Sequence, residues 1–87
     1  MQEIIFIYAN SCKDCARMKK ILTESLEEYR LSDIVTVVEY DSDDDVAVDI
    51  AVKYQIYDIP GCNVNGKSFF GKNFSSNDIK DAIKSLA

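Results

Sequence analysis

Short, continuously apolar segments alternate along the chain with longer segments in which apolar residues recur every three or four positions. Residues 3–9 are almost entirely apolar, the pattern of a central strand covered on both faces. Residues 34–40 are rich in β-branched side chains and predict a second strand. Residues 12–30 predict an amphipathic helix of roughly five turns. The apolar stripe of this helix comprises Cys15, Met18, Ile21, Leu22, Leu26 and Tyr29.

The second half of the chain predicts two more helices and a β-hairpin. Residues 46–54 read as a helix that ends at the segment 57–61, which contains the only proline. Asn65-Gly66 is typical of a two-residue type I′ turn, here between strands 62–64 and 67–70. We expect Val46, Ile50 and Tyr54 on the inner face of the first of these helices. We expect a final helix capped by Ser75 or Ser76, with Ile79, Ile83 and Leu86 on its buried side and Asp78 near its N-terminus.

The order of these elements is strand, helix, strand, helix, strand, strand, helix. Two crossover connections imply parallel strands, and the hairpin adds an antiparallel edge. The sequence therefore predicts an α/β protein, a single domain over residues 1–87 with a four-stranded mixed sheet between layers of helices.

Charge and composition narrow the classes of partner. The formal net charge is −5, and no basic stripe of the kind that binds nucleic acid is present. The N-terminal apolar segment lacks a basic flank and is too short for a signal peptide or membrane span. We therefore expect a cytoplasmic protein, monomeric by default at this size, with neither nucleic acid nor membrane as a partner.

Thiols are the main candidates for chemistry. Three cysteines, an odd number, argue against a secreted disulfide scaffold and for a reducing compartment. The absence of histidine removes Cys-His catalysis and His-containing zinc sites.

Two of the cysteines, Cys12 and Cys15, stand where the first strand gives way to the first helix. Residues three apart on a helix have Cβ atoms about 5–6 Å apart, close to what a disulfide needs. The free N–H groups and the dipole of the helix start favour a thiolate at Cys12. Cys12 is therefore the candidate nucleophile and Cys15 its resolving partner, with Asn10 and Ser11 expected to supply the turn and the helix cap.

The charges of the first helix oppose the usual dipole preference. Its first half carries Lys13, Arg17, Lys19 and Lys20, and its second half Glu24, Glu27 and Glu28. One interpretation is a cluster of cations that favours the Cys12 thiolate, opposed by Asp14; the other is a solvated face whose charges are largely screened. On the first interpretation, Lys13, Asp14 and Ser11 tune the thiolate.

The acidic run 41–45 has a superficial likeness to a calcium loop. Counted from Asp41, position 6 is Val46 and not glycine, and position 12 is Val52 and not glutamate, so the EF-hand pattern fails. Carboxylates that cap and complement the start of the next helix are the better account.

Cys62 is interpreted as a buried apolar cysteine, with a third thiol near the active site as the alternative. For Phe69 and Phe70, strand alternation predicts one buried and one partly exposed ring.

These features together resemble the thioredoxin-like fold in its small, glutaredoxin-sized form. The resemblance rests on Cys12-Lys13-Asp14-Cys15 after the first strand, Ile59-Pro60-Gly61 before the hairpin, and Val64-Asn65-Gly66-Lys67 followed by Gly71. It implies a three-layer α/β/α architecture and a thiol-disulfide oxidoreductase that uses the Cys12–Cys15 couple without a cofactor or metal. It also implies a cis Pro60 beside the cysteines and a substrate-binding surface at Ile59, Pro60 and Gly61.

The partners expected from the resemblance are a disulfide-containing protein or small thiol as substrate and an upstream dithiol reductase. The chain departs from the family in several places: Phe6 stands where thioredoxins place a buried carboxylate, and Gly71-Lys72 lacks the glutathione-holding pattern of glutaredoxins. Two alternatives stay open. One is a zinc or iron–sulfur module that uses Cys12, Cys15 and Cys62, and the other is a non-catalytic interaction domain.

Overall fold

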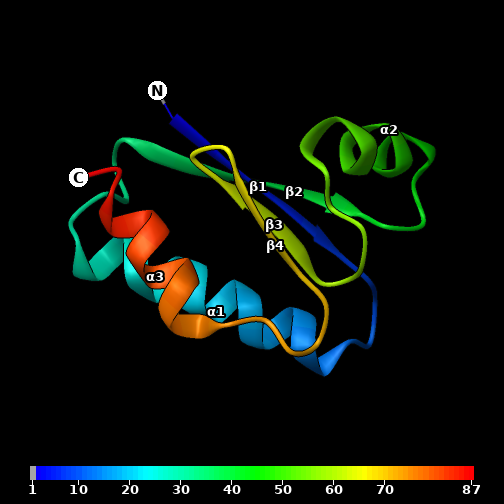
Figure 1. Ribbon diagram of the computed structural model, residues 1–87, viewed down its shortest axis with the longest axis horizontal. Helices are drawn as coiled ribbons and strands as arrows, with labels where there is room; N and C mark the ends of the chain where they lie inside the picture. Colours follow the sequence, from blue (N-terminus) through cyan, green and yellow to red (C-terminus); the bar gives the residue numbers. More distant parts are fainter. Residues whose placement is uncertain (1) are drawn as a thin grey trace.

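The computed structural model describes residues 2–87 and contains the predicted elements in the predicted order (Figure 1). They are β1 (Gln2–Tyr8), α1 (Lys13–Glu28), β2 (Val35–Asp41), α2 (Asp45–Tyr54), β3 (Gly61–Val64), β4 (Lys67–Phe70) and α3 (Ser76–Lys84). None of the helices within these residues is long and apolar enough to cross a membrane.

The four strands form one mixed sheet in the order β2-β1-β3-β4. β1 and β2 are parallel, with Tyr8 opposite Asp41 at their C-terminal ends. The second expected crossover is wrong: β3 is antiparallel to β1, because the chain enters β3 at the end of the sheet where β2 finishes. β3 is also antiparallel to β4, so Gly61 at its start lies opposite Ile7 and opposite Phe70. The ends of three strands and the start of β3 therefore meet at one edge of the sheet, where the chain leaves β1 for α1.

Helices cover the sheet on both faces, as the predicted three-layer architecture requires. α1 and α3 lie side by side on one face, and α2 lies alone on the other (Figure 1). Strand alternation places Ile4 and Phe6 in the core under α1 and α3, and Ile5 and Ile7 in the core under α2. The larger core, on the α1 and α3 side, also contains Cys15, Met18, Leu22, Leu26, Leu31, Val35, Cys62, Val64, Phe74, Ile79, Ala82 and Ile83.

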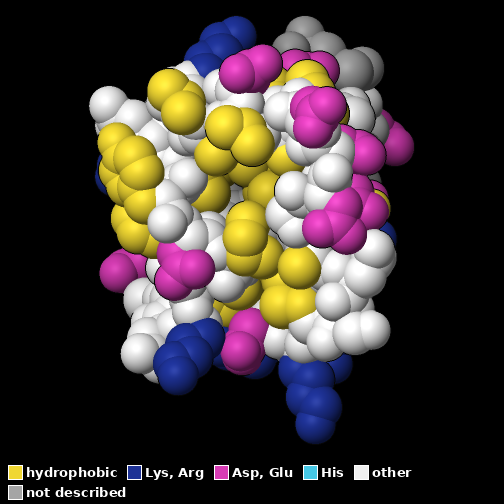
Figure 2. Space-filling model, turned by 90° about the vertical axis from the view of Figure 1, so that its right-hand side faces the viewer, with side chains coloured by type: hydrophobic (Ala, Val, Ile, Leu, Met, Phe, Trp, Pro, Cys, Tyr) yellow, Lys and Arg dark blue, Asp and Glu magenta, His cyan; other side chains and the backbone are white. Residues whose placement is uncertain are grey.

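The predicted inner face of α2 is wrong by one position. Val46 is 49% exposed, and Ala47 is the buried residue of this turn. Ile50 and Tyr54 do pack on the sheet, together with Ala51. The three charged residues of the helix, Asp45, Asp49 and Lys53, share one face, and the buried side centres on Ala47 and Ala51 opposite them, which leaves Val46 at the boundary. Hydrophobic side chains consequently reach the surface on the side of the molecule where α2 lies (Figure 2).

The start of α1 differs from expectation, and that of α2 agrees in part, with carboxylates at its N-cap and in its first turn. The N-cap of α1 is Cys12 itself, and the N-cap of α2 is Asp44, whose side chain makes no capping hydrogen bond. In the acidic run, Asp41 instead accepts the backbone N–H of Asp43 at 3.0 Å. The third start is as predicted, since the Ser75 hydroxyl accepts the backbone N–H of Asp78 at 3.3 Å.

Ser25 is a polar residue in the buried stripe of α1. Its side chain is 1% exposed, and its hydroxyl has no hydrogen-bond partner within residues 2–87. A buried, unpaired hydroxyl is costly, and alanine is the better helix former. We expect Ser25→Ala to raise the free energy of unfolding by about 1 kcal/mol in urea denaturation. Thr23→Ala, at an exposed position of the same helix, is the control, and an equal gain in both variants would contradict the explanation.

Candidate active site

A disulfide joins Cys12 to Cys15 at the edge of the sheet where β1 leads into α1. Their Cα atoms are 5.2 Å apart. Ser11 lies in the turn before them with a positive φ of 58°. Cys12 is partly exposed, whereas Cys15 is 4% exposed and belongs to the core. Of the two cysteines, Cys12 is therefore the more accessible.

Backbone N–H groups point at both sulfur atoms. Cys15 N–H donates to Cys12 Sγ at 3.1 Å, and Ala9 N–H donates to Cys15 Sγ at 3.5 Å. The cap expected from Asn10 or Ser11 is thus supplied by Cys12. In the reduced protein a hydrogen bond from the helix start favours negative charge on this sulfur.

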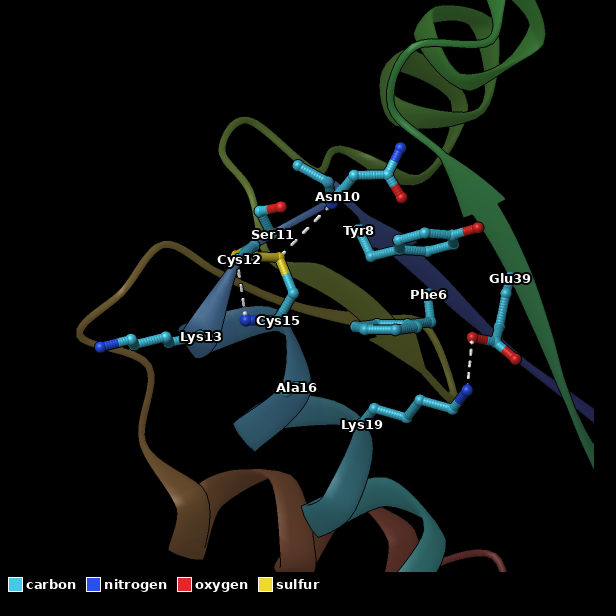
Figure 3. A pocket seen from close by; sticks show the side chains of 11 residues that line it. Phe6, Tyr8, Asn10, Ser11, Cys12, Lys13, Cys15, Ala16, Lys19 and Glu39 are labelled. Atoms are coloured by element: carbon cyan, nitrogen blue, oxygen red, sulfur yellow. Dashed lines mark hydrogen bonds and ion pairs between the residues drawn. A yellow bond between two sulfur atoms is a disulfide. The ribbon is translucent and has the colours of Figure 1, made fainter.

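A groove of about 660 Å³ lies directly beside the disulfide (Figure 3). Phe6 and Tyr8 stack within it, with ring centroids 5.9 Å apart and planes 23° apart. At the end away from the sulfurs, Lys19 Nζ lies 3.0 Å from Glu39 Oε1. The lining residues are Phe6, Tyr8, Ala9, Asn10, Ser11, Cys12, Lys13, Cys15, Ala16, Lys19 and Glu39. The groove is thus largely apolar, and the Lys19–Glu39 ion pair lies at one end of it.

Three of the four cations of α1, Arg17, Lys19 and Lys20, form ion pairs with carboxylates, which partly neutralises their charge. Lys20 pairs with Glu24 at 3.9 Å, and Lys19 with Glu39. The side chain of Lys13 points away from the disulfide (Figure 3).

Arg17 ties α1 to the loop between β4 and α3. It pairs with Asp14 at 3.3 Å and donates to the carbonyl oxygen of Lys72 at 2.8 Å. Its guanidinium carbon lies 4.1 Å from the centroid of the Phe74 ring. Asp14 therefore forms an ion pair with Arg17, one cation of the expected cluster. Asp14 does not line the groove.

The segment Ile59-Pro60-Gly61 lies at the same edge of the sheet as the cysteines. The peptide bond before Pro60 is cis, as the resemblance implies, and Gly61 pairs with Ile7 in β1. Gly71 N–H donates to the Pro60 carbonyl oxygen at 2.9 Å. Ile59 and Cys12 pack against the same core, but none of the three residues of this segment lines the groove. The expected substrate surface and the groove are therefore separate features of this edge.

Cys62 is fully buried in the core, as predicted, opposite Phe6 in the sheet. Burial raises the pKa of its thiol to about 12, so the group is a neutral thiol at pH 8. We expect iodoacetamide at pH 8 to alkylate Cys12 in the native, reduced protein and to modify Cys62 only in denaturant. Peptide mass spectrometry of the two samples measures this difference, and rapid native modification of Cys62 would contradict it.

The third thiol therefore lies in the core and not on the accessible side of the disulfide. Within residues 2–87, no group of three or more Cys, Asp, Glu or His side chains is placed to hold a metal ion.

Sequence reasoning missed the groove and its ion pair. Glu39 is a charged residue that interrupts the apolar run of β2, and this interruption was the available signal. Its significance depends on the register that sets it opposite Phe6.

Comparisons with known proteins agree on the fold. No family model matches the sequence. A thioredoxin-like protein of known crystal structure superposes with a TM-score of 0.65 at 20% identity, covering 91% of this chain and 97% of the other. An uncharacterized thioredoxin-like protein from Clostridium perfringens gives 0.71 at 21% identity, covering 98% and 70%. The oxidised thioredoxin of Plasmodium falciparum gives 0.63 at 21% identity, covering 98% and 80%. The chain therefore has the thioredoxin-like fold, with a Cys12–Cys15 disulfide at the start of α1.

Proposed function

We propose that this protein is a thiol-disulfide oxidoreductase whose Cys12–Cys15 couple exchanges electrons with a substrate disulfide. The observation that carries the proposal is the position of Cys12. Cys12 is partly exposed, and its sulfur caps α1 and accepts the N–H of Cys15 at 3.1 Å, while its disulfide partner is buried. This arrangement favours the thiolate at the accessible sulfur, which is the nucleophile of disulfide exchange.

The reaction requires two displacements. The Cys12 thiolate attacks one sulfur of the substrate disulfide, forms a mixed disulfide and releases the other substrate sulfur as a thiolate, which takes a proton from water. Cys15 then loses its proton and attacks Cys12 Sγ, which releases the second substrate thiolate and forms the Cys12–Cys15 disulfide. The Ala9 N–H, 3.5 Å from Cys15 Sγ, supports the charge that develops there. Two electrons have then passed from the protein to the substrate.

The cycle needs a substrate and a source of electrons. A disulfide-containing protein or small disulfide accepts two electrons, and an upstream dithiol reductase restores the reduced Cys12 and Cys15. A reducing cytoplasm is the compartment that fits this use of thiols. The backbone of Ile59, before cis Pro60, is the proposed pairing surface for a substrate chain.

An equilibrium redox titration tests the proposal. The protein is held in dithiol and glutathione buffers of graded potential, alkylated and weighed as intact protein. We expect a reversible two-electron transition between about −180 and −270 mV. A protein that shows no transition, or shows one only after a bound metal is stripped, would contradict the proposal.

A further inference from the structure

α2 exposes more apolar side chains than a helix on the surface of a sheet ordinarily does. A surface helix ordinarily keeps its apolar residues on the inner side, but Val46, Val48 and Val52 are 49%, 64% and 72% exposed. α2 lies alone on its face of the sheet, and Ala47 is its only fully buried residue (Figure 1). Its inner side already fills the core with Ala47, Ile50, Ala51 and Tyr54.

The outward side of α2 carries a regular stripe. Asp45, Val48, Asp49 and Val52 follow the spacing of a single helix face and are all exposed. Val48 is 64% exposed and Val52 is 72% exposed. Valine is a poor helix former, so these residues aid neither the helix nor the core. Two exposed valines framed by aspartates are better explained by contact with another molecule.

Figure 2 views the side of the molecule on which α2 lies. Exposed hydrophobic side chains lie on this side of the molecule with Asp and Glu among them; the exposed apolar residues of α2 are Val46, Val48 and Val52. We propose that the outward face of α2, defined by Asp45, Val48, Asp49 and Val52, is a docking surface for a protein partner that presents apolar side chains within a rim of lysine and arginine.

The negative charge of this surface favours a basic protein partner over a second copy of this chain and over anionic lipid. α2 and the turn before it contain Asp43, Asp44, Asp45 and Asp49, and Lys53 is the one cation of the helix. A second copy would bring two such acidic surfaces together, and anionic lipid would meet the same repulsion. A basic, apolar protein surface gains both charge complementarity and burial of the valines.

The turn that precedes the docking surface contacts the end of β1 and the loop before the disulfide. The turn before α2 is tied to the end of β1, since Ser42 N–H donates to the Tyr8 carbonyl oxygen at 2.8 Å. Asn10 Nδ2 of the loop before Cys12 lies 3.4 Å from Asp41 Oδ2. A partner seated on α2 would therefore lie beside this loop. The proposal rests on the surface alone and does not require redox activity.

Binding of a model peptide tests the surface. The probe is a helical 15-residue peptide of leucine and lysine, titrated into isotopically labelled protein and followed by NMR. We expect shifts confined to α2 and the turn before it, and weaker binding of a leucine and glutamate peptide. Val48→Gln/Val52→Gln should weaken affinity for the basic peptide at least tenfold, and Asp45→Asn/Asp49→Asn at least threefold.

Matched variants make these results specific. Ile34→Gln is the control for the valines, because it removes an apolar side chain that is 54% exposed and lies outside α2. Glu27→Gln/Asp33→Asn is the control for the aspartates, because it removes two exposed charges elsewhere. Both control variants should change the affinity for the basic peptide less than twofold. If the glutamine pair lowers the unfolding midpoint, Val48→Ala/Val52→Ala replaces it, because alanine favours the helix. Equal effects of the α2 and control variants, shifts on another face, dimerisation through α2 in sedimentation, or binding of the protein to phosphatidylserine vesicles would overturn the proposal.

Discussion

Replacing Cys15 by serine is expected to convert the protein into a trap that stays covalently attached to its substrate, whereas replacing Cys12 by serine abolishes exchange. Cys12 is the accessible sulfur and forms the first bond, so its loss leaves no nucleophile at the surface. Without Cys15, the mixed disulfide at Cys12 has no resolving thiol. Incubation with a disulfide-bonded protein such as insulin, followed by non-reducing electrophoresis and intact mass, measures the trapped adduct.

The third cysteine provides the control for this pair. Cys62 is buried in the core, so Cys62→Ala should retain exchange and form no lasting adduct. The Cys12→Ser rate should fall to that of the reaction without protein. Equal trapping by the Cys12 and Cys15 variants would contradict the assigned roles, and full activity of Cys12→Ser would contradict the proposed function itself.

The sequence was sufficient for the order of elements and the architecture because each signal was local. The apolar run in β1, the Asn65-Gly66 turn and the Ser75 cap depend on nearby residues alone. The rotation of α2 about its own axis, which decides the residues that face the sheet, was predicted incorrectly. The row Val46, Ile50 and Tyr54 suggests one inner face, but the charged row Asp45, Asp49 and Lys53 borders Val46, and packing on the sheet selects Ala47 and Ala51 for the inner side.

The disulfide pair was predictable, but its surroundings were not. Cysteine is not among the usual capping residues, so local preference assigned the cap of α1 to Asn10 or Ser11. The hydrogen bond from Cys15 N–H depends on the conformation of this turn. The Lys19–Glu39 pair joins a helix to a strand 20 residues away in sequence, and only the sheet register and helix packing bring the two charges together.

Gly61→Ala is expected to destabilise the protein by about 2–3 kcal/mol, a large part of the stability of a domain this small. A Cβ atom at this position would lie 2.0 Å from Ile56 Cγ2 and 3.0 Å from the backbone oxygen of Asp58. Ile56 is buried, and the second neighbour is backbone, so neither can yield without displacing the segment that leads to Pro60. Urea denaturation measures the loss of stability. We also expect slower reaction with protein disulfides than with a small disulfide reagent, because the displaced segment includes the proposed pairing surface.

Gly66 distinguishes crowding from backbone strain. Gly66 has a φ of +84°, and a Cβ atom at this position would have no heavy atom within 4 Å. Alanine there should therefore lower the free energy of unfolding by about 1–2 kcal/mol through backbone conformation alone. Asparagine tolerates left-handed backbone, so Gly66→Asn should recover part of that loss. Gly61 lies outside the left-handed region, and Gly61→Asn should be at least as damaging as Gly61→Ala because it adds atoms to a crowded site. Recovery of stability by asparagine at position 61 would show that backbone conformation, and not the contact with Ile56, explains this glycine.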